Sequence, residues 1–239
     1  AGGFFNLRVK NDTMAEKAVC GQFANILIEG KTLRRPISIC EVDKEEGILR
    51  FVFEVRGEGT GILSTTKAGD MLDILGPLGR GYTVMPAPQH AVLIGGGIGT
   101  PPLLQTLKSI GNPADVILGF RNAGAVILEE DFKKYANEVF IATDNGSYGH
   151  HGFVTDLLMK RLETPCDKIF ACGPTPMLKA ITKIAIDHDI PCEISMEERM
   201  GCGIGACLSC ACKVKGIDSY VHVCKMGPVF DARKVDFGG

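Results

Sequence analysis

Four cysteines lie within residues 202 to 212, which read CGIGACLSCAC, and a fifth follows at Cys224. The spacing Cys202-x4-Cys207-x2-Cys210, with Cys224 after thirteen further residues, is typical of plant-type ligation of a [2Fe–2S] cluster. The intervening glycines and alanines let the backbone come close, so that N–H groups can face the negatively charged sulfur atoms. We therefore predict that these four thiolates, those of Cys202, Cys207, Cys210 and Cys224, hold such a cluster.

A zinc site is the alternative interpretation of these cysteines. Structural zinc sites usually combine two C-x2-C pairs, and only Cys207 and Cys210 form such a pair here. Cys212 is a fifth thiol that could replace a ligand, although we expect a packed neighbour, and His222 offers weaker evidence for a mixed Cys/His set. The other cysteines are scattered singly, which favours reduced thiols and a metal site over a disulfide framework. They are Cys20, Cys40, Cys166, Cys172 and Cys192.

The middle of the chain alternates strand-like and helix-like segments, which predicts βαβ units in a doubly wound parallel sheet. Strands are expected at 90–96, 115–120, 138–144, 168–172 and 191–196, and helices at 101–110, 129–136, 154–162 and 176–188. The glycine- and cysteine-rich tail from Glu197 looks too irregular to join this sheet. His150-His151 is interpreted as a polar turn.

The first part of the chain is expected to be all-β, because short β-rich runs alternate with turn residues. These runs cover 4–9, 23–28, 37–42, 48–55 and 71–75. A small barrel or sandwich is predicted, followed by a linker at 85–89. Three domains result, at 1–87, 88–192 and 193–239.

Two glycine-containing loops follow predicted strands of the parallel sheet. The first, from Gly95 to Thr100, opens a helix, where backbone amides can meet a phosphate. The second, from Cys172 to Met177, ends a later strand, and both should lie at the carboxyl edge where ligands bind in open α/β folds. Nucleotide binding is predicted, and a ligand-free tight turn is the alternative. The candidate residues are Gly95, Gly96, Gly97, Gly99, Thr100, Cys172, Gly173, Pro174 and Met177.

A third candidate phosphate site lies in the β part. Arg35 precedes a proline-fixed extended segment and can present its guanidinium to a phosphate, with the Ser38 hydroxyl further along. Backbone N–H groups at Gly59-Thr60-Gly61 could contact the same pyrophosphate. A surface arginine pair before a strand is the alternative interpretation.

Composition excludes two classes of partner. The net charge of −2 gives no basis for a nucleic-acid surface. The most apolar stretch, 91–104, is broken by glycine and proline well short of the ~20 residues of a membrane span. Without a secretory segment at its start, the chain is expected to be cytoplasmic.

Taken together, these motifs resemble the ferredoxin–NADP reductase superfamily. Within that superfamily the chain is similar to the electron-transfer subunits of NAD-linked (class 1B) dihydroorotate dehydrogenase. The matching stretches are Gly21-Gln22-Phe23, Arg35-Pro36-Ile37-Ser38, Gly95 to Pro102, Cys172-Gly173-Pro174 with Met177, and Met196-Glu197-Glu198-Arg199-Met200 leading into the cysteine loop. The last is the most specific.

The resemblance implies a role for each matching residue. Arg35 would bind the FAD pyrophosphate within Arg35-Pro36-Ile37-Ser38, while Gly59 and Thr60 would hold the diphosphate. Val52, Phe53 and Glu54 would line the flavin edge. Ser38 beside the flavin ring and Cys172 beside the nicotinamide would be the two residues at the reacting rings. The four cluster ligands would be Cys202, Cys207, Cys210 and Cys224.

The resemblance also implies a reaction and a partner. Electrons would pass from NADH to FAD, then singly to the cluster, and on to FMN in a dihydroorotate dehydrogenase catalytic subunit, within a heterotetramer of two plus two chains. Arg121, after the second strand of the parallel sheet, leaves NADPH as an alternative to NADH. A reductase subunit of another redox complex and a zinc-stapled module without redox activity are the rival functions. The family usually has a further strand before the segment at 4–9.

Overall fold

The computed structural model describes residues 3–84, 90–111 and 114–238, so the predicted linker at 85–89 lies outside the described residues. The N-terminal part is an antiparallel five-stranded sheet in the order β1-β4-β3-β2-β5. Its strands are β1 (Phe4–Lys10), β2 (Phe23–Ile26), β3 (Arg35–Asp43), β4 (Ile48–Glu54) and β5 (Ile74–Leu78). No pairing between β5 and β1 is found in the described part of the chain, so closure into a barrel stays a prediction.

Two short helices interrupt this β part and were not predicted. Helix α1 (Asp12–Lys17) starts at Asn11, whose side-chain oxygen accepts a hydrogen bond from the Met14 N–H at 2.9 Å. It buries Met14 and Ala15 against the sheet. Helix α2 (Glu58–Leu63) covers the other end of the sheet, where its Leu63 side chain is buried. Tertiary burial stabilises helices of one to two turns that propensity alone does not specify.

The middle of the chain forms a seven-stranded sheet in the order β14-β11-β10-β6-β7-β8-β9. It contains β6 (Ala91–Gly96), β7 (Ala114–Phe120), β8 (Val139–Thr143), β9 (His150–His151), β10 (Lys168–Cys172), β11 (Cys192–Ser195) and β14 (Val229–Asp231). All neighbouring strands are parallel except β11 and β14. The predicted parallel sheet is confirmed, with one antiparallel strand, β14, at its edge.

Two sequence predictions about this sheet were wrong. The tail does join it, because β14 pairs antiparallel with β11, Ile194 opposite Phe230. His150 and His151 form the edge strand β9 rather than a turn, since they continue the ladder beside Ala142 and Thr143. Both segments are too short to show a periodic pattern, and only the neighbouring strand edge orders them.

Helices cover both faces of this sheet. Along β6, Ala91 and Leu93 point into one apolar cluster and Val92 and Ile94 into the other, as expected for a strand buried on both sides. Helices α3 (Pro101–Ile110) and α4 (Glu129–Lys133) pack on the first side, and α5 (Val154–Arg161) and α6 (Thr175–Asp187) on the second. No helix among the described residues is long and apolar enough to cross a bilayer.

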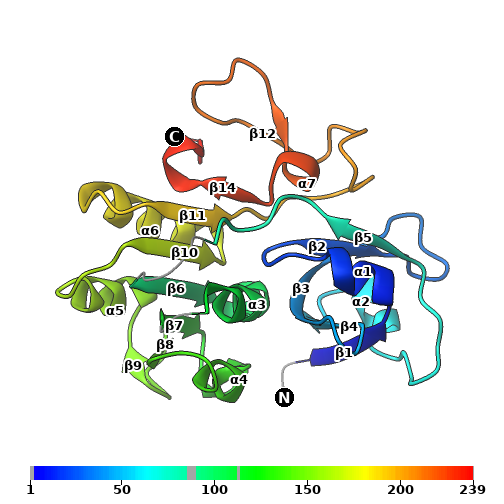
Figure 1. Ribbon diagram of the computed structural model, residues 1–239, viewed down its shortest axis with the longest axis horizontal. Coiled ribbons are helices and arrows are strands. Elements are labelled where there is room, and N and C mark those ends of the chain that lie inside the picture. Colours follow the sequence, from blue (N-terminus) through cyan, green and yellow to red (C-terminus); the bar gives the residue numbers. More distant parts are fainter. Residues whose placement is uncertain (1–2, 85–89, 112–113, 239) are drawn as a thin grey trace.

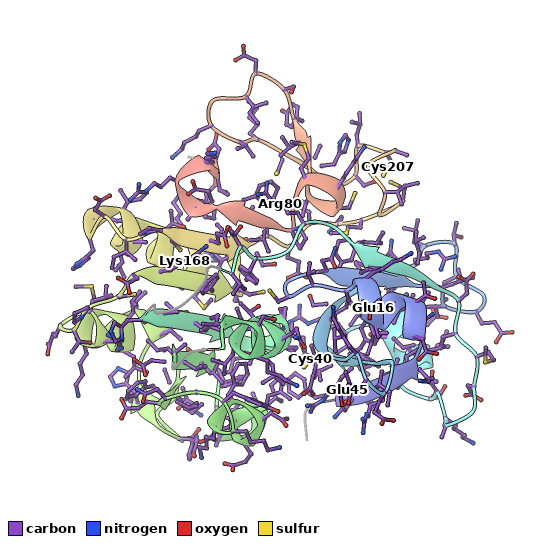
Figure 2. The ribbon with its side chains drawn as sticks, in the orientation of Figure 1. Glu16, Cys40, Glu45, Arg80, Lys168 and Cys207 are labelled. Carbon is purple, nitrogen blue, oxygen red and sulfur yellow. The ribbon has the colours of Figure 1, made fainter. Side chains whose placement is uncertain are left out.

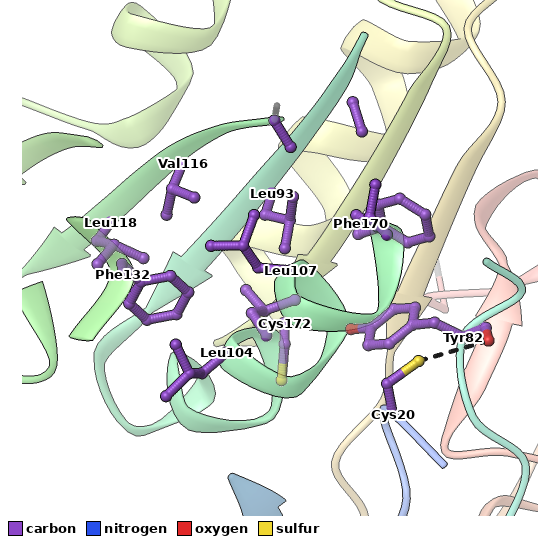
Figure 3. Packing of buried hydrophobic residues seen from close by; sticks show 14 of the residues in the cluster. Cys20, Tyr82, Leu93, Leu104, Leu107, Val116, Leu118, Phe132, Phe170 and Cys172 are labelled. Atoms are coloured by element: carbon purple, nitrogen blue, oxygen red, sulfur yellow. Dashed lines mark hydrogen bonds between the residues drawn. The ribbon is translucent and has the colours of Figure 1, made fainter. Parts of the chain in front are cut away.

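The two sheets share one apolar core across their boundary. Cys20 and Tyr82 of the β part pack in the same cluster as Leu104 and Phe170 (Figure 3), and Cys40 belongs to this cluster too. The Tyr82 hydroxyl, within this cluster, donates to a strand carbonyl of β10, the Ala171 oxygen, at 2.9 Å. The core therefore fixes the N-terminal sheet against the side of the parallel sheet.

The C-terminal segment lies across both sheets, above them in Figure 1. It contains the hairpin of β12 (Ala211–Cys212) and β13 (Val221–His222), followed by α7 (Val223–Met226). The Arg80 N–H donates to the Gly227 carbonyl at 2.5 Å, and this bond ties the C-terminal segment to the N-terminal part. Strand β14 ties it to the parallel sheet. The cysteine segment is thus held from two sides.

Candidate functional site

The four predicted cluster cysteines lie in the C-terminal segment, where Cys207 is labelled in Figure 2. Cys202 and Cys207 interact through their side chains, as do Cys210 and Cys224. Within residues 3–84, 90–111 and 114–238, no three His, Cys, Asp or Glu side chains converge as they would on one metal ion. Two neighbouring thiol pairs are compatible with a two-iron cluster, in which each iron takes two cysteines.

The backbone of this loop is arranged to donate to sulfur. The N–H groups of Ile204, Ala206 and Cys207 point at the Cys202 sulfur, at 3.5, 3.2 and 3.4 Å. The Gly205 N–H points at the Cys224 sulfur, at 3.2 Å. Gly205, with a φ of 79°, adopts the left-handed region that favours glycine. Such donors stabilise thiolates, so the loop fits an iron–sulfur group.

The two thiol pairs differ in electrostatics. Hydrogen bonding with Ser209 and with backbone N–H groups lowers the pKa of Cys207 to about 6, and backbone hydrogen bonds lower the pKa of Cys202. Burial raises the pKa of Cys224 to about 12. The outer pair, Cys202 and Cys207, is therefore predisposed to be thiolate, whereas Cys224 of the inner pair needs a bound metal to lose its proton.

The two alternative ligands are placed on the hairpin. Cys212 lies opposite Val221 in the β12–β13 pair and packs in the apolar cluster beneath the loop. Burial raises the pKa of its thiol, with nearby Glu198 as the next cause. His222 lies opposite Ala211. This position suits Cys212 as a packed neighbour of the cluster loop.

The predicted flavin residues come together at the start of β3. The Arg35 guanidinium lies over Gly59, where a Cβ atom would come within 2.6 Å of the arginine Nε. Thr60, one residue on, donates its hydroxyl to the Gly57 carbonyl at 3.1 Å and so shapes the start of α2. Arginine and helix-start N–H groups are the usual partners of a pyrophosphate.

The β4 residues predicted to line the flavin edge, 52–54, lie on both faces of the strand. Phe53 is turned into the core and stacks on Phe5 with ring centroids 5.8 Å apart. Val52 points the opposite way, into the core shared by the two sheets, while Glu54 accepts a hydrogen bond from Arg56. A flavin contact at Phe53 would therefore come from its backbone rather than its ring.

Ser38 lies one strand away from the cysteine loop. On β3, the segment Arg35-Pro36-Ile37-Ser38 pairs with all of β2, Ser38 opposite Phe23. Phe23 in turn packs in one cluster with Cys210 and Cys224. A single strand thus separates the predicted flavin motif from the predicted iron–sulfur loop.

The two nucleotide loops are packed directly on each other. They follow the neighbouring strands β6 and β10, Cys172 opposite Gly95. A Cβ atom on Gly96 would come within 2.6 Å of the Met177 sulfur, and one on Gly99 within 2.7 Å of the Gly173 Cα. Only glycine allows this close approach, which occurs at the carboxyl edge of the sheet, where ligands of open α/β folds bind. Gly97, with a φ of 52°, turns the chain into the helix that starts after Thr100.

Cys172 is buried at the end of β10. Burial raises the pKa of its thiol to about 12, and only a hydrogen bond with Ser195 opposes this. Cys172 is therefore a neutral thiol at physiological pH and does not act as a thiolate nucleophile. A small neutral side chain is compatible with a position beside a nicotinamide ring.

Sequence reasoning missed three polar residues in the buried regions. Lys168 and Glu193 form an ion pair at 3.2 Å on neighbouring strands and hold both backbone groups of Thr83. Asn25, in β2, is fully buried beside the cysteine loop. The available sign was a charged or polar residue within a short, mostly apolar strand segment: KIFAC for Lys168, CEIS for Glu193 and FANI for Asn25.

Comparison with known proteins agrees with this arrangement. Residues 93–183 match the family model of the oxidoreductase NAD-binding domain, and residues 197–236 match the iron-sulfur cluster binding domain of dihydroorotate dehydrogenase B. The electron transfer subunit of dihydroorotate dehydrogenase B (NAD(+)) from Fusobacterium nucleatum is 43% identical, over 97% of this chain and 92% of that protein. The corresponding subunit from Streptococcus mutans is 42% identical over the same shares.

The chain belongs to the family of dihydroorotate dehydrogenase B electron transfer subunits. The resemblance seen in the sequence motifs is confirmed. The chain is thus an oxidoreductase subunit with an NAD-binding domain and an iron–sulfur domain.

Solved structures extend the comparison to the fold. A chain of the NADH-dependent reduced ferredoxin-NADP oxidoreductase, from a study of flavin-based electron bifurcation, superposes with a TM-score of 0.90 at 30% identity, covering 99% of this chain and 86% of that one. The ferredoxin reductase of carbazole 1,9a-dioxygenase superposes at 0.65 over 79% and 62% of the two chains, at 21% identity, and shows the fold alone. The ferredoxin-reductase architecture is confirmed. Sequence identity favours the dihydroorotate dehydrogenase family over the rival redox complex.

Proposed function

We propose that this chain carries electrons between NAD(H) and an FMN-containing dihydroorotate dehydrogenase catalytic subunit, through bound FAD and a [2Fe–2S] cluster. The assembly would be a cytoplasmic heterotetramer of two chains of each kind. The three predicted domains, at 1–87, 88–192 and 193–239, would supply the flavin, nicotinamide and cluster sites, with the first sheet closing into a flavin barrel. Strand β14 makes the third unit an extension of the second.

The observation that carries the proposal is the position of β2. One edge of β2 pairs with Arg35–Ser38, and Phe23 on the strand packs with Cys210 and Cys224. A flavin held by the first motif and a cluster held by the second would be separated by one strand. When bound, flavin exchanges an electron pair with nicotinamide and single electrons with an iron–sulfur cluster.

The residues of the chain would bind and position these groups. Arg35 and the start of α2 would hold the FAD diphosphate, while Ser38 places a hydroxyl near the ring. Gly95–Thr100 and Cys172–Met177 would bind the dinucleotide, and the neutral Cys172 would contact the nicotinamide. Cys202, Cys207, Cys210 and Cys224 would ligate the irons.

Co-expression with an FMN-containing dihydroorotate dehydrogenase subunit tests the function directly. Anaerobically purified complex should be brown, contain iron, acid-labile sulfide and both flavins, and reduce orotate with NADH. The family relation supports NADH, so the rate with NADPH should be lower; a preference for NADPH would point to Arg121 and reverse that choice. A colourless, iron-free protein would end the proposal.

Arg35 is expected to govern FAD retention. Replacing it by glutamine removes charge-assisted hydrogen bonds worth about 1.5–3 kcal/mol, so the FAD dissociation constant should rise about 10- to 100-fold. Arg34→Gln is the matched control, because the Arg34 guanidinium already donates two hydrogen bonds to the Asp73 carboxylate, at 2.9 and 3.0 Å. Fluorescence titration of the flavin-free protein measures both. An equal loss of FAD affinity in the two variants would contradict the role of Arg35.

The catalytic subunit is expected to dock at the cysteine loop. Leu208 is 77% exposed, Ile204 54% and Met226 47%, so three exposed apolar side chains lie within two residues of a predicted cluster cysteine. Exposed apolar patches of this kind mark partner surfaces. Leu208→Glu should weaken subunit association about 10- to 100-fold, the cost of a central contact residue. Met71→Glu, at an apolar residue that is 94% exposed and lies in the loop before β5, should leave association unchanged.

A further inference from the structure

Asn25 is a buried amide whose side chain has no hydrogen-bond partner in the part of the chain that the structure describes. It lies in the middle of β2, opposite Pro36 on one side and Leu75 on the other. Its exposed fraction is 0%, and neither its side-chain oxygen nor its nitrogen has a hydrogen-bond partner among the described residues. Exchanging the two amide atoms would not help, since both are unpaired. A buried polar group left unpaired costs about 1–3 kcal/mol, so a missing partner is expected.

The alternation of β2 shows where that partner lies. Ala24 and Ile26 point into the apolar interior of the N-terminal sheet. Phe23 and Asn25 point the other way, and Phe23 packs on Cys210 there. Because side chains two apart on a strand share a face, the amide is directed at the cysteine loop.

The contact with the loop is at Gly203. The Asn25 Nδ2 atom lies so close to the Gly203 backbone that a Cβ atom there would overlap it. Gly203 has a φ of 75° and follows Cys202 directly. The side-chain N–H groups therefore enter a loop whose backbone N–H groups already point at the Cys202 and Cys224 sulfur atoms.

We propose that the Asn25 side-chain amide donates a hydrogen bond to a sulfur atom of the iron–sulfur cluster held by this loop. The inference rests on the proposed function, because it needs the cluster. It adds a donor from the flavin-binding sheet to those that the loop itself provides. Asn25 would thus be the residue through which β2 tunes the cluster.

The expected consequence concerns the reduction potential. Reduction adds negative charge to the cluster, and a hydrogen-bond donor stabilises the more negative state. Removing the donor should therefore favour the oxidised cluster. A charge-assisted hydrogen bond predicts about a tenfold shift of the oxidised/reduced equilibrium, which lowers the midpoint potential by about 59 mV for one electron.

The test compares Asn25→Leu with Thr182→Val in the purified holoprotein. Leucine keeps most of the side-chain volume and removes the donor. Thr182 is the matched control, since its buried hydroxyl also lacks a partner in the described structure but lies on α6 in the nicotinamide domain. EPR-monitored redox titration gives the cluster midpoint, and iron analysis gives its occupancy. The expected result is a lower midpoint for Asn25→Leu alone, at unchanged iron content and flavin potential.

A second measurement needs no variant. Protein labelled with ¹⁵N in the asparagine side-chain amide should show a ¹⁵N coupling to the reduced cluster by pulsed EPR, whether or not Asn25→Leu retains iron. An unchanged midpoint in iron-loaded Asn25→Leu, a shift of the flavin potential instead, or an absent coupling would overturn the inference. A wild-type chain without any cluster would overturn the proposed function itself.

Discussion

Replacing Cys210 by alanine is expected to abolish the cluster and, with it, electron transfer to the catalytic subunit. Cys210 is buried and belongs to the inner thiol pair with Cys224, so one iron would keep a single cysteine ligand. Removing a hydrogen-bond partner of a metal ligand lowers metal affinity or activity about 10- to 100-fold, and removing the ligand itself should lower it further. NADH:orotate activity of the complex should fall by more than about 100-fold. Reduction of the bound flavin by NADH should persist.

Cys212→Ala is the matched control for this prediction. Cys212 is only two residues further on and shares the apolar cluster beneath the loop, but it is placed as a packed neighbour. Iron and sulfide analysis, with the EPR spectrum of the reduced protein, should match the unmodified chain. If Cys212→Ala loses iron while Cys210→Ala retains it, the ligand set is assigned incorrectly.

Replacing Lys168 by methionine is expected to destabilise the chain strongly. The Lys168 ammonium donates to the Thr83 carbonyl at 2.7 Å, and Glu193 accepts from the Thr83 N–H at 2.8 Å. The lysine side chain is 8% exposed and that of Glu193 18%. Breaking a buried ion pair leaves an uncompensated charge and costs about 3–5 kcal/mol. For a chain of this size the melting temperature should fall by roughly 6–20 °C.

An exposed ion pair provides the comparison for Lys168. Lys183 pairs with Asp187 on α6, with side chains 75% and 51% exposed. Lys183→Met should cost less than about 1 kcal/mol, because solvent screens the pair. Thermal unfolding of the loaded protein measures both variants. A similar effect at the two positions would show that Thr83, beside the boundary between the sheets, is not held by the buried pair.

Much of the fold was accessible from local patterns. Helix α3 starts and ends where the apolar period and Pro101 predicted, and β10 coincides with the segment KIFAC. Those elements have long or strongly apolar patterns. Helix α1 and the strands β9 and β14 were not predicted, because their formation depends on a cap or on a neighbouring strand edge.

The site divides in the same way. The cysteine spacing and the two glycine loops predicted which residues would do chemistry, because ligand geometry and close backbone approach restrict residue types locally. Sequence patterns did not predict that Phe53 would turn into the core or that Asn25 would face the cysteine loop. Those directions follow from which face of a strand is covered.

The sequence alone therefore determined the family and the alternation of strands and helices, and it predicted the cofactor-binding motifs. Tertiary structure alone decided that β2 lies between the predicted flavin motif and the cluster loop, and that Lys168 and Glu193 hold Thr83. The physical reason is the range of the interactions. Motif chemistry acts over a few neighbouring residues, whereas burial and pairing join segments that are distant in the chain.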